Sequence, residues 1–396
     1  MEGEHVMNKS GTRKIVLAFV VIVALVITLS LVSNRIWSDK PENIEISGEL
    51  VFSDGMTLAE FGQKNDIPNP VLKETFGLKT QEDVKKSLDS FGLSQEEITK
   101  KITKGAVLDA EHESKNWVKI LIKFVLWFAF LIVVFVMMYR GKIVPTTRKV
   151  LYISAMLIFG VIMGSDPSPM GTVKDAIALY GSHGVIFPPR IIALFAFLLL
   201  VFLANKFICS WGCQVGTLQD LIFRVNRNSK DTKGIIRQYK IPFAITNTIR
   251  IAFFIVFTIV AFMWATDIFE YIDPFKIYKP AVVTYGGWIF IAAILVGSLF
   301  VYRPWCHLFC PFGLVGWLVE KISLYKIQVN YDTCIACESC AKACPSSVME
   351  AILKRDKVIP DCFACANCID VCPTQSISFR TGKREKPPEG KFAGDK

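Results

Sequence analysis

Two stretches near the carboxyl end decide the fold of that region: CIACESCAKACP at residues 334–345 and CFACANCIDVCP at residues 362–373. Both follow the pattern C-x2-C-x2-C-x3-C-P, so each places four cysteines at the same short spacings and ends on a proline. A disulfide framework scatters its cysteines through small loops, whereas short repeated spacings are typical of metal ligation in a reducing compartment. The doubled pattern therefore predicts two metal centres in a small C-terminal region.

The spacing is that of bacterial ferredoxins with two 4Fe-4S clusters, in which the fourth cysteine of each run ligates the other cluster. Each predicted ligand set therefore draws on both stretches. The first set is Cys334, Cys337, Cys340 and Cys372, and the second set is Cys362, Cys365, Cys368 and Cys344. Zinc is the alternative, but its usual sites pair cysteines without a third cysteine two residues further on. We expect two 4Fe-4S clusters and one-electron transfer between them.

A second group of cysteines lies upstream and is also doubled. Its members are Cys209 and Cys213 in the first copy, and Cys306 and Cys310 in the second. The copies are 97 residues apart, and Gly216 and Gly313 occupy the same place in each. Such a repeat would bring the pairs together near a pseudo-twofold axis, and a helical backbone would put i and i+4 thiols on one face. Three roles stay open: a third metal or iron-sulfur site, a redox dithiol, or buried thiols without function.

The rest of the chain has the composition of a membrane protein. Of its 396 residues 52% are hydrophobic and 20% charged, and the mean hydropathy is +0.41, which excludes an ordinary soluble enzyme. Six apolar stretches approach the length of a membrane span: residues 15–33, 117–138, 150–163, 191–208, 241–265 and 286–301. The first is interpreted as a retained anchor instead of a cleaved signal peptide.

The orientation follows from the basic loops 140–149 and 206–240, because short cytoplasmic loops collect Lys and Arg. This pattern predicts a multi-pass protein of the cytoplasmic (inner) membrane with both termini in the cytoplasm. The net charge of +10 then reflects topology, and we expect the lipid bilayer, and no nucleic acid, as a partner. Residues 36–116 are acidic and show apolar positions at helical spacing, which predicts a small extracytoplasmic helical insert.

The predicted fold class is therefore mainly α: a six-helix membrane domain with an extracytoplasmic insert and a C-terminal, ferredoxin-like α+β domain with two clusters. The expected units are the N-terminus with its first span (1–35), the insert (36–116), the remaining five-helix membrane domain (117–325), the ferredoxin domain (326–380) and a polar tail (381–396).

Histidine is absent from the apolar stretches and arginine is rare in them, and both facts are informative. The four histidines, His5, His112, His183 and His307, all lie outside those stretches, whereas a transmembrane haem needs axial ligands at bilayer depth, so we expect no haem. Arg250 lies about nine residues into the fifth stretch. It is either a contact for a quinone or cluster, or a side chain that snorkels to the cytoplasmic surface, which is the interpretation favoured here. Asp273 heads an outer loop whose acids are a weaker hypothesis for accepting protons.

At these residues the chain resembles the polyferredoxin membrane proteins of the NapH, NosR and CcoG type. The features that carry the resemblance are the two thiol pairs, the loop around Asp273 and the two C-terminal cysteine runs, and the match covers about residues 149–380. Two features depart from the family: Gln214 stands where the first thiol pair is usually followed by proline, and an extra span with an acidic insert precedes the repeats.

The resemblance implies electron transfer between the membrane quinone pool, or another membrane redox subunit, and 4Fe-4S clusters at the cytoplasmic face, as in a quinol dehydrogenase subunit. Two alternatives stay open. In the first, of the CcoG type, the thiol pairs bind and reduce copper, because soft thiolates favour Cu(I). In the second, of the NosR type, the chain is a redox sensor or assembly factor and not an enzyme. The direction of electron flow cannot be deduced from ligand spacing, because cluster potentials span a wide range.

Overall fold

The computed structural model describes residues 9–37, 50–53, 55–78 and 82–392, most of them helical. Among these residues, four helices are long and apolar enough to cross a membrane. They are α1 (Lys9–Trp37), α5 (Trp117–Tyr139), α11 (Phe243–Trp264), and α6 (Pro145–Ala155) with the π-helix Met156–Ile162 that continues it. The 23 residues of α5 rise about 35 Å, more than the roughly 30 Å hydrocarbon core of a bilayer. The chain is a membrane protein.

The fourth and sixth apolar stretches form shorter helices. These are α8 (Pro188–Ala204) and α13 (Tyr285–Phe300), of 17 and 16 residues. After each helix a residue with positive φ turns the chain, Asn205 at 62° and Arg303 at 46°, and a short helix follows. The short helices are α9 (Phe207–Trp211) and α14 (Pro304–Leu308). The prediction that the fourth span continues to residue 208 is therefore wrong, because the backbone of Asn205 leaves the helical region of φ.

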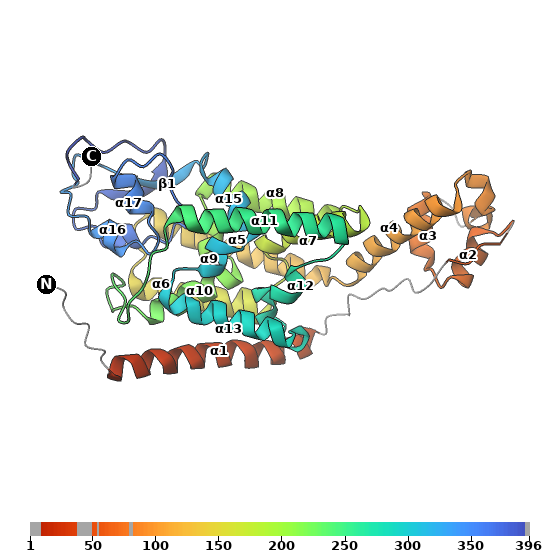
Figure 1. Cartoon of the computed structure of the whole chain (residues 1–396), viewed down its shortest axis with the longest axis horizontal. Helices are drawn as coiled ribbons and strands as arrows, with labels where there is room; N and C mark the ends of the chain where they lie inside the picture. Colours follow the sequence, from red (N-terminus) through yellow and green to blue (C-terminus); the bar gives the residue numbers. More distant parts are fainter. Residues whose placement is uncertain (1–8, 38–49, 54, 79–81, 393–396) are drawn as a thin grey trace.

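The long helices run side by side along the longest axis of the molecule (Figure 1). Shorter helices fill the bundle, including α10 (Gln214–Val225), α12 (Phe269–Ile272) and α15 (Pro311–Glu320). Helix α7 (Pro169–His183) lies between the third and fourth apolar stretches of the sequence. It crosses α11 closely at Gly181, where an added Cβ would lie 2.7 Å from the carbonyl oxygen of Ala261. A side chain at this position would push the two helices apart.

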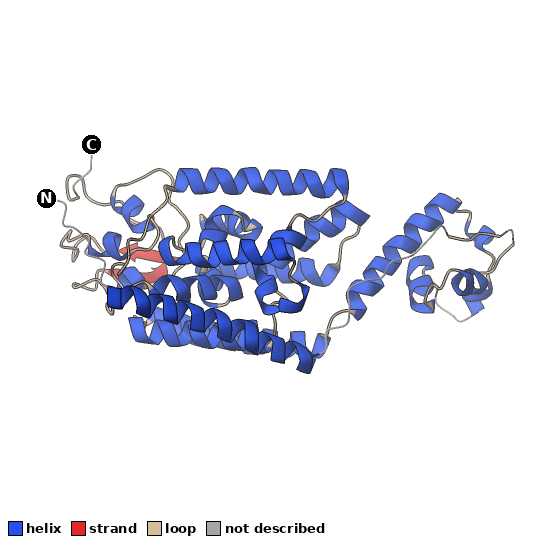
Figure 2. Cartoon of the chain, turned by 60° about the horizontal axis from the view of Figure 1, so that its bottom comes forward, coloured by secondary structure: helices blue, strands red, loops and turns tan. Residues whose placement is uncertain are grey.

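The insert is a small helical unit with an apolar core of its own. It contains α2 (Leu58–Lys64), α3 (Asn69–Phe76) and α4 (Gln95–Glu113), as the helical spacing predicts. Capping boxes begin α2 and α4, because Thr57 and Ser94 accept from the backbone N–H of Glu60 and Glu97, and each glutamate accepts in return. Figures 1 and 2 show the insert at one end of the bundle and the C-terminal region at the opposite end.

The C-terminal region is an α+β unit built around the two cysteine runs. Strands β1 (Tyr325–Val329) and β2 (Ile377–Thr381) pair antiparallel with Ile327 opposite Phe379 and join the two ends of the region. Between them lie the short helices α16 (Ser339–Ala343), α17 (Val348–Leu353) and α18 (Asn367–Asp370). Figure 2 shows this small sheet beside the ends of the membrane helices. The predicted helical protein with a small ferredoxin-like sheet at its carboxyl end is confirmed.

Candidate functional site

The two C-terminal cysteine runs have the same backbone conformation. In the first run, Ala336 and Glu338 flank Cys337 with φ of 55° and 54°; in the second, Ala364 and Ala366 flank Cys365 with φ of 50° and 62°. Residues other than glycine rarely adopt a positive φ. Those that do concentrate at ligand sites, where the surrounding structure compensates the backbone strain. The same departure in both runs indicates that each is shaped to hold the same kind of group.

The region contains two cavities, and each is lined by cysteines from both runs. One cavity is lined by Cys344, Cys362, Cys365 and Cys368, and the other by Cys334, Cys337, Cys340 and Cys372. All eight side chains are free thiols. A donor set of four cysteines at this spacing fits a 4Fe-4S cluster. The structure thus brings together the two crossed sets that the spacing predicts, and the residues present fit the group.

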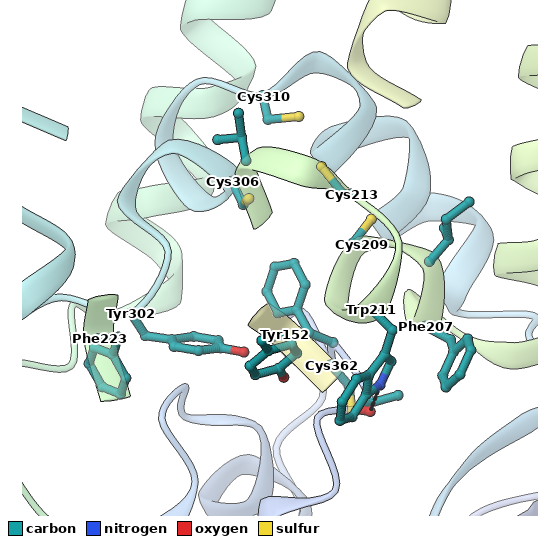
Figure 3. Packing of buried hydrophobic residues seen from close by; sticks show 14 of the residues in the cluster. Tyr152, Phe207, Cys209, Trp211, Cys213, Phe223, Tyr302, Cys306, Cys310 and Cys362 are labelled. Carbon is teal, nitrogen blue, oxygen red and sulfur yellow. Dashed lines mark hydrogen bonds between the residues drawn. The ribbon is translucent and has the colours of Figure 1, made fainter. Parts of the chain in front are cut away.

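The upstream thiols also come together, although not on one helical face. Cys209 and Cys306 lie within α9 and α14, whereas Cys213 and Cys310 have extended backbones and are the N-caps of α10 and α15. The condition for an i, i+4 face, a helical backbone through the motif, is not met, because each motif is a helix, a turn and a second helix. The four cysteines nevertheless lie near one another, where the two motifs meet (Figure 3).

Each thiol motif closes on itself through the same close contact in both copies. An added Cβ on Gly216 would lie 2.5 Å from the carbonyl oxygen of Cys209, and one on Gly313 would lie 2.7 Å from that of Cys306. Only glycine fits at either place, so each motif closes tightly on itself. This shared requirement explains the matching glycines of the sequence repeat.

Basic side chains tie each copy to the other. Arg303, three residues before Cys306, donates to the carbonyl oxygen of Cys209 at 2.6 Å. Lys206, three residues before Cys209, donates to the carbonyl oxygen of Gly313 at 3.0 Å. Both side chains are fully buried. The exchange is reciprocal and therefore supports the pseudo-twofold arrangement predicted from the repeat.

Asp361 joins the C-terminal region to the membrane helices. Its carboxylate lies 2.7 Å from the Arg250 guanidinium and 3.0 Å from the Lys206 ammonium, and none of the three side chains is exposed. Arg250 also donates to the carbonyl oxygen of Cys306 at 3.3 Å. The favoured interpretation that Arg250 snorkels to the surface is wrong, since its partner Asp361 offers a buried carboxylate. No described contact tests the alternative that Arg250 touches a quinone.

Aromatic contacts lie between the thiol motifs and the second cysteine run. Trp211, between Cys209 and Cys213 in sequence, donates from Nε1 to the carbonyl oxygen of Ala364 at 3.1 Å. The Phe363 ring lies 4.6 Å from the Lys206 ammonium and 4.9 Å from the Arg303 guanidinium. The cavity of Cys362, Cys365 and Cys368 is thus packed against the thiol site, whereas Cys337 of the other cavity is exposed.

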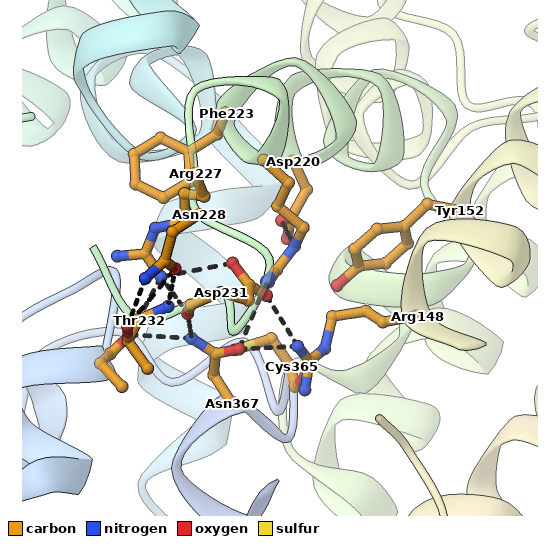
Figure 4. Close-up of polar contacts among 12 residues, drawn as sticks. Arg148, Tyr152, Asp220, Phe223, Arg227, Asn228, Asp231, Thr232, Cys365 and Asn367 are labelled. Carbon is orange, nitrogen blue, oxygen red and sulfur yellow. Dashed lines mark hydrogen bonds and ion pairs between the residues drawn. The ribbon is translucent and has the colours of Figure 1, made fainter. Parts of the chain in front are cut away.

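A second polar network holds the same cysteine run from another side (Figure 4). Arg148 donates from Nε to the carbonyl oxygen of Cys365 at 3.0 Å and from Nη1 to Asp231 at 2.7 Å. Arg224 contacts Asp231 and pairs with Asp220 at 2.6 Å. These bonds restrain the loop around Cys365 from the membrane side.

Buried cations outnumber buried carboxylates around these sites. The cations are Arg148, Lys206, Arg224, Arg227, Arg250 and Arg303, and the aspartates are Asp220, Asp231 and Asp361. Glu320 accepts from the backbone N–H of Cys362 at 3.0 Å. Burial raises the pKa of Glu320 to about 8, and the negative charge of Asp361 contributes to this rise in pKa. Thiolates are the ligand form of cysteine and carry negative charge, so this cationic surplus suits an anionic group held by them.

Asp361, Lys206 and Arg148 belong to the site but were not predicted from the sequence. Two signals were present: Asp361 directly precedes Cys362, and Lys206 and Arg303 occupy matching positions of the repeat. The loop acid Asp273 lies at the opposite end of the bundle, where it caps a short 3-10 helix by accepting from the N–H of Phe275. Burial raises the pKa of Asp273 to about 6.

Comparisons with known families match the two cysteine regions. A 4Fe-4S dicluster domain model matches residues 326–373, and a 4Fe-4S binding domain model matches twice, at residues 186–230 and 283–330. The two matches of the 4Fe-4S binding domain begin 97 residues apart, which is the offset of the thiol repeat. The repeat and the iron-sulfur character of the C-terminal region are confirmed.

Three curated relatives share part of the chain. YccM of Escherichia coli is 29% identical over 163 residues, covering 39% of this chain and 45% of YccM. The regulatory protein NosR of Pseudomonas aeruginosa is 26% identical over 149 residues, covering 34% of this chain and 19% of NosR. An uncharacterised protein of Methanocaldococcus jannaschii is 22% identical over 154 residues, covering 38% of this chain and 56% of that protein. The matches thus span about half of these relatives or less, and no solved structure matches.

Proposed function

Because the chain is an iron-sulfur protein related to the polyferredoxin membrane proteins of the NapH and NosR type, we propose that it transfers electrons between the membrane quinone pool and 4Fe-4S clusters at one membrane face. The observation that carries this proposal is the packing of one four-cysteine cavity against the membrane-exit thiols, through Trp211 and Phe363. YccM bears the name of an electron transport protein, which agrees with this role.

The proposed ligands are the two sets of cysteines that line the C-terminal cavities. Clusters bound there would supply one-electron transfer. The protein contributes the environment: the buried cations around Asp361 and Asp231 favour negative charge, and limited solvent access strengthens their effect. Hydrogen bonds from Arg148 and Trp211 to backbone carbonyls hold the run around Cys365 in position.

The structure suggests an order for the sites. The set with Cys344, Cys362, Cys365 and Cys368 is proximal, since its loop carries the contacts to the membrane helices. The set that includes Cys337 is distal, and the exposure of Cys337 makes it the end at which a further redox partner would exchange electrons. The thiols Cys209, Cys213, Cys306 and Cys310 are proposed as a third redox site on the membrane side of the proximal set.

The topology that goes with this proposal has six spans, both termini in the cytoplasm and the unit boundaries at residues 35, 116, 325 and 380. The start of α1 and the C-terminal region lie at the same end of the bundle, which supports that arrangement (Figure 1). Copper handling at the thiols is the alternative function, because soft thiolates favour Cu(I).

The order of the sites is tested with protein purified without oxygen in detergent. We expect decylubiquinol to reduce both C-terminal sites of the wild type, followed as separate EPR signals. Cys344→Ser should remove the proximal signal and stop quinol from reducing the distal site, although dithionite still reduces it. Cys337→Ser should remove the distal signal and leave quinol reduction of the proximal site intact. Equal quinol reduction of the distal site in Cys344→Ser would contradict the order, and an inert wild type would contradict the proposed function.

A further inference from the structure

A cavity with one charged part and one apolar part opens at the insert end of the membrane bundle. The charged part has a volume of about 770 Å³, and the apolar part has a volume of about 110 Å³. Both parts share Asp166, Asp175 and Arg190 in their linings, so they are neighbouring halves of one site. A volume of this size is in the range of small-molecule sites.

The apolar part lies between α5 and α8 and has aromatic walls. Trp117 and Phe124 come from α5, and Phe187 lies just before α8, with 6.4 Å between the ring centroids of Trp117 and Phe187. Neighbouring side chains on the same two helices, Val118 and Ile192, are both 69% exposed and apolar, as lipid-facing residues are. The apolar part is therefore within reach of a molecule dissolved in the bilayer.

The charged part begins where the apolar part ends. Asp175 lies 3.2 Å from Arg190 and 3.0 Å from Lys174, and Lys174 also lies 3.8 Å from Asp273. Charges of both signs alternate here, so the site is poorly suited to the phosphate of a lipid head group, which requires a surplus of cations. It is better suited to a neutral ring that donates and accepts hydrogen bonds at its edge.

From this geometry we infer that the cavity binds the head group of a membrane quinol, with its ring between Phe124 and Phe187 and a hydroxyl facing Asp175. The inference rests on the proposed function and adds the place of the quinol. Oxidation of the quinol breaks its two O–H bonds and yields a quinone, two protons and two electrons. The protons pass to Asp175 and the neighbouring acids of the charged part, and the electrons pass singly to the iron-sulfur groups.

A line of contacts leads from the cavity toward the thiol site. Asp166 and Pro167 line the cavity, and their carbonyl oxygens accept from the buried ammonium of Lys123 at 3.0 and 3.3 Å. That ammonium lies 5.6 Å from the ring centroid of Trp127. Trp127 packs on Gly212 of the first thiol motif, where an added Cβ would be 2.4 Å from its Nε1. The quinol site and the thiol motifs thus share a continuous packed wall.

The quinol cavity and the cysteine sets lie at opposite ends of the helix bundle, and this determines on which side protons and electrons are released. The acids that receive protons face the end of the bundle that carries the insert, whereas the cysteine sets lie at the opposite end (Figures 1 and 2). Protons therefore leave on the insert side, and electrons cross to the C-terminal side. Quinol oxidation by this protein separates charge across the membrane.

The test uses two substitutions in the full-length protein with its iron-sulfur groups. Ala193→Phe places a ring inside the apolar part, and Ile192→Phe, the control, adds a ring at the lipid-facing neighbour. Decylubiquinone binding is measured by quenching of tryptophan fluorescence, because Trp117 lies in the wall. We expect Ala193→Phe to raise the Kd by about tenfold or more and the control to leave it within about twofold.

Asp175→Asn provides a second variant that keeps the shape of the cavity. We expect it to slow cluster reduction by decylubiquinol by about 100-fold, the usual effect of losing a positioned base, and to raise the Kd for decylubiquinone far less than Ala193→Phe does. Dithionite reduction should be the same in all variants. If Ala193→Phe and Asp175→Asn both behave as wild type while quinol still reduces the clusters, the cavity is not the quinol site although the proposed function stands. If quinol reduces the clusters of neither the wild type nor any variant, the proposed function itself fails.

Discussion

Asp361→Asn is the substitution with the largest expected consequence for the junction between the C-terminal region and the membrane helices. Asparagine preserves the size of the side chain and removes its charge. Arg250, 2.7 Å away, and Lys206, 3.0 Å away, then remain buried without their carboxylate. Removing one partner of a buried ion pair costs about 3–5 kcal/mol, because the remaining charge is left uncompensated.

That cost is a large share of the roughly 5–15 kcal/mol that stabilises a typical domain. We therefore expect the C-terminal region to detach or unfold at a temperature at least about 10 °C lower than in the wild type. Unfolding is followed by the loss of iron-sulfur absorbance on heating in detergent. Asp356→Asn serves as the control, since Asp356 is exposed and lies in the same region.

A double-mutant cycle assigns the effect to the ion pair. If Arg250 and Asp361 act together, Arg250→Gln combined with Asp361→Asn should cost clearly less than the sum of the two single substitutions. An Asp361→Asn protein that loses its absorbance at the wild-type temperature would refute the view that this buried contact holds the region in place.

Three further results are expected. Gly313→Ala should destabilise the second thiol motif, because the new methyl carbon would meet the carbonyl oxygen of Cys306 at 2.7 Å, whereas Gly286→Ala, with open space around it, should not; circular dichroism melts compare the two. Ser94→Ala should cost the insert about 1 kcal/mol by removing the cap that accepts from Glu97, measured by chemical denaturation. In sealed vesicles, a membrane potential of about 100 mV, negative on the cluster side, should oppose quinol-driven cluster reduction by up to about 2.3 kcal/mol per electron, which a rate unaffected by potential would contradict.

Local spacing was sufficient to predict how the cysteines of the C-terminal region are grouped. The positions of Cys334 and Cys362 in their runs predict crossed ligand sets, and the cavities contain those sets. Apolar length likewise predicted α5 and α11, because a bilayer requires a nearly constant length of helix.

Contacts between residues far apart in the chain could not be predicted in this way. Asp361 and Lys206 are 155 residues apart, and nothing near either residue identifies its partner. The sharp turn at Asn205 was also missed, because the apolar pattern continues beyond it while the backbone leaves the helix. A lone buried charge such as Arg250 has several possible partners in the sequence, and only the packing of the folded chain selects one.

The most direct test of the central claim is an iron and acid-labile sulfide determination on protein isolated without oxygen, combined with EPR during a redox titration. We expect about eight iron atoms per chain from the two C-terminal cysteine sets, and about twelve if the membrane-exit thiols also hold a cubane cluster. Protein that folds fully but contains neither iron nor sulfide, even after anaerobic reconstitution, would contradict the claim that these cysteines bind iron-sulfur clusters.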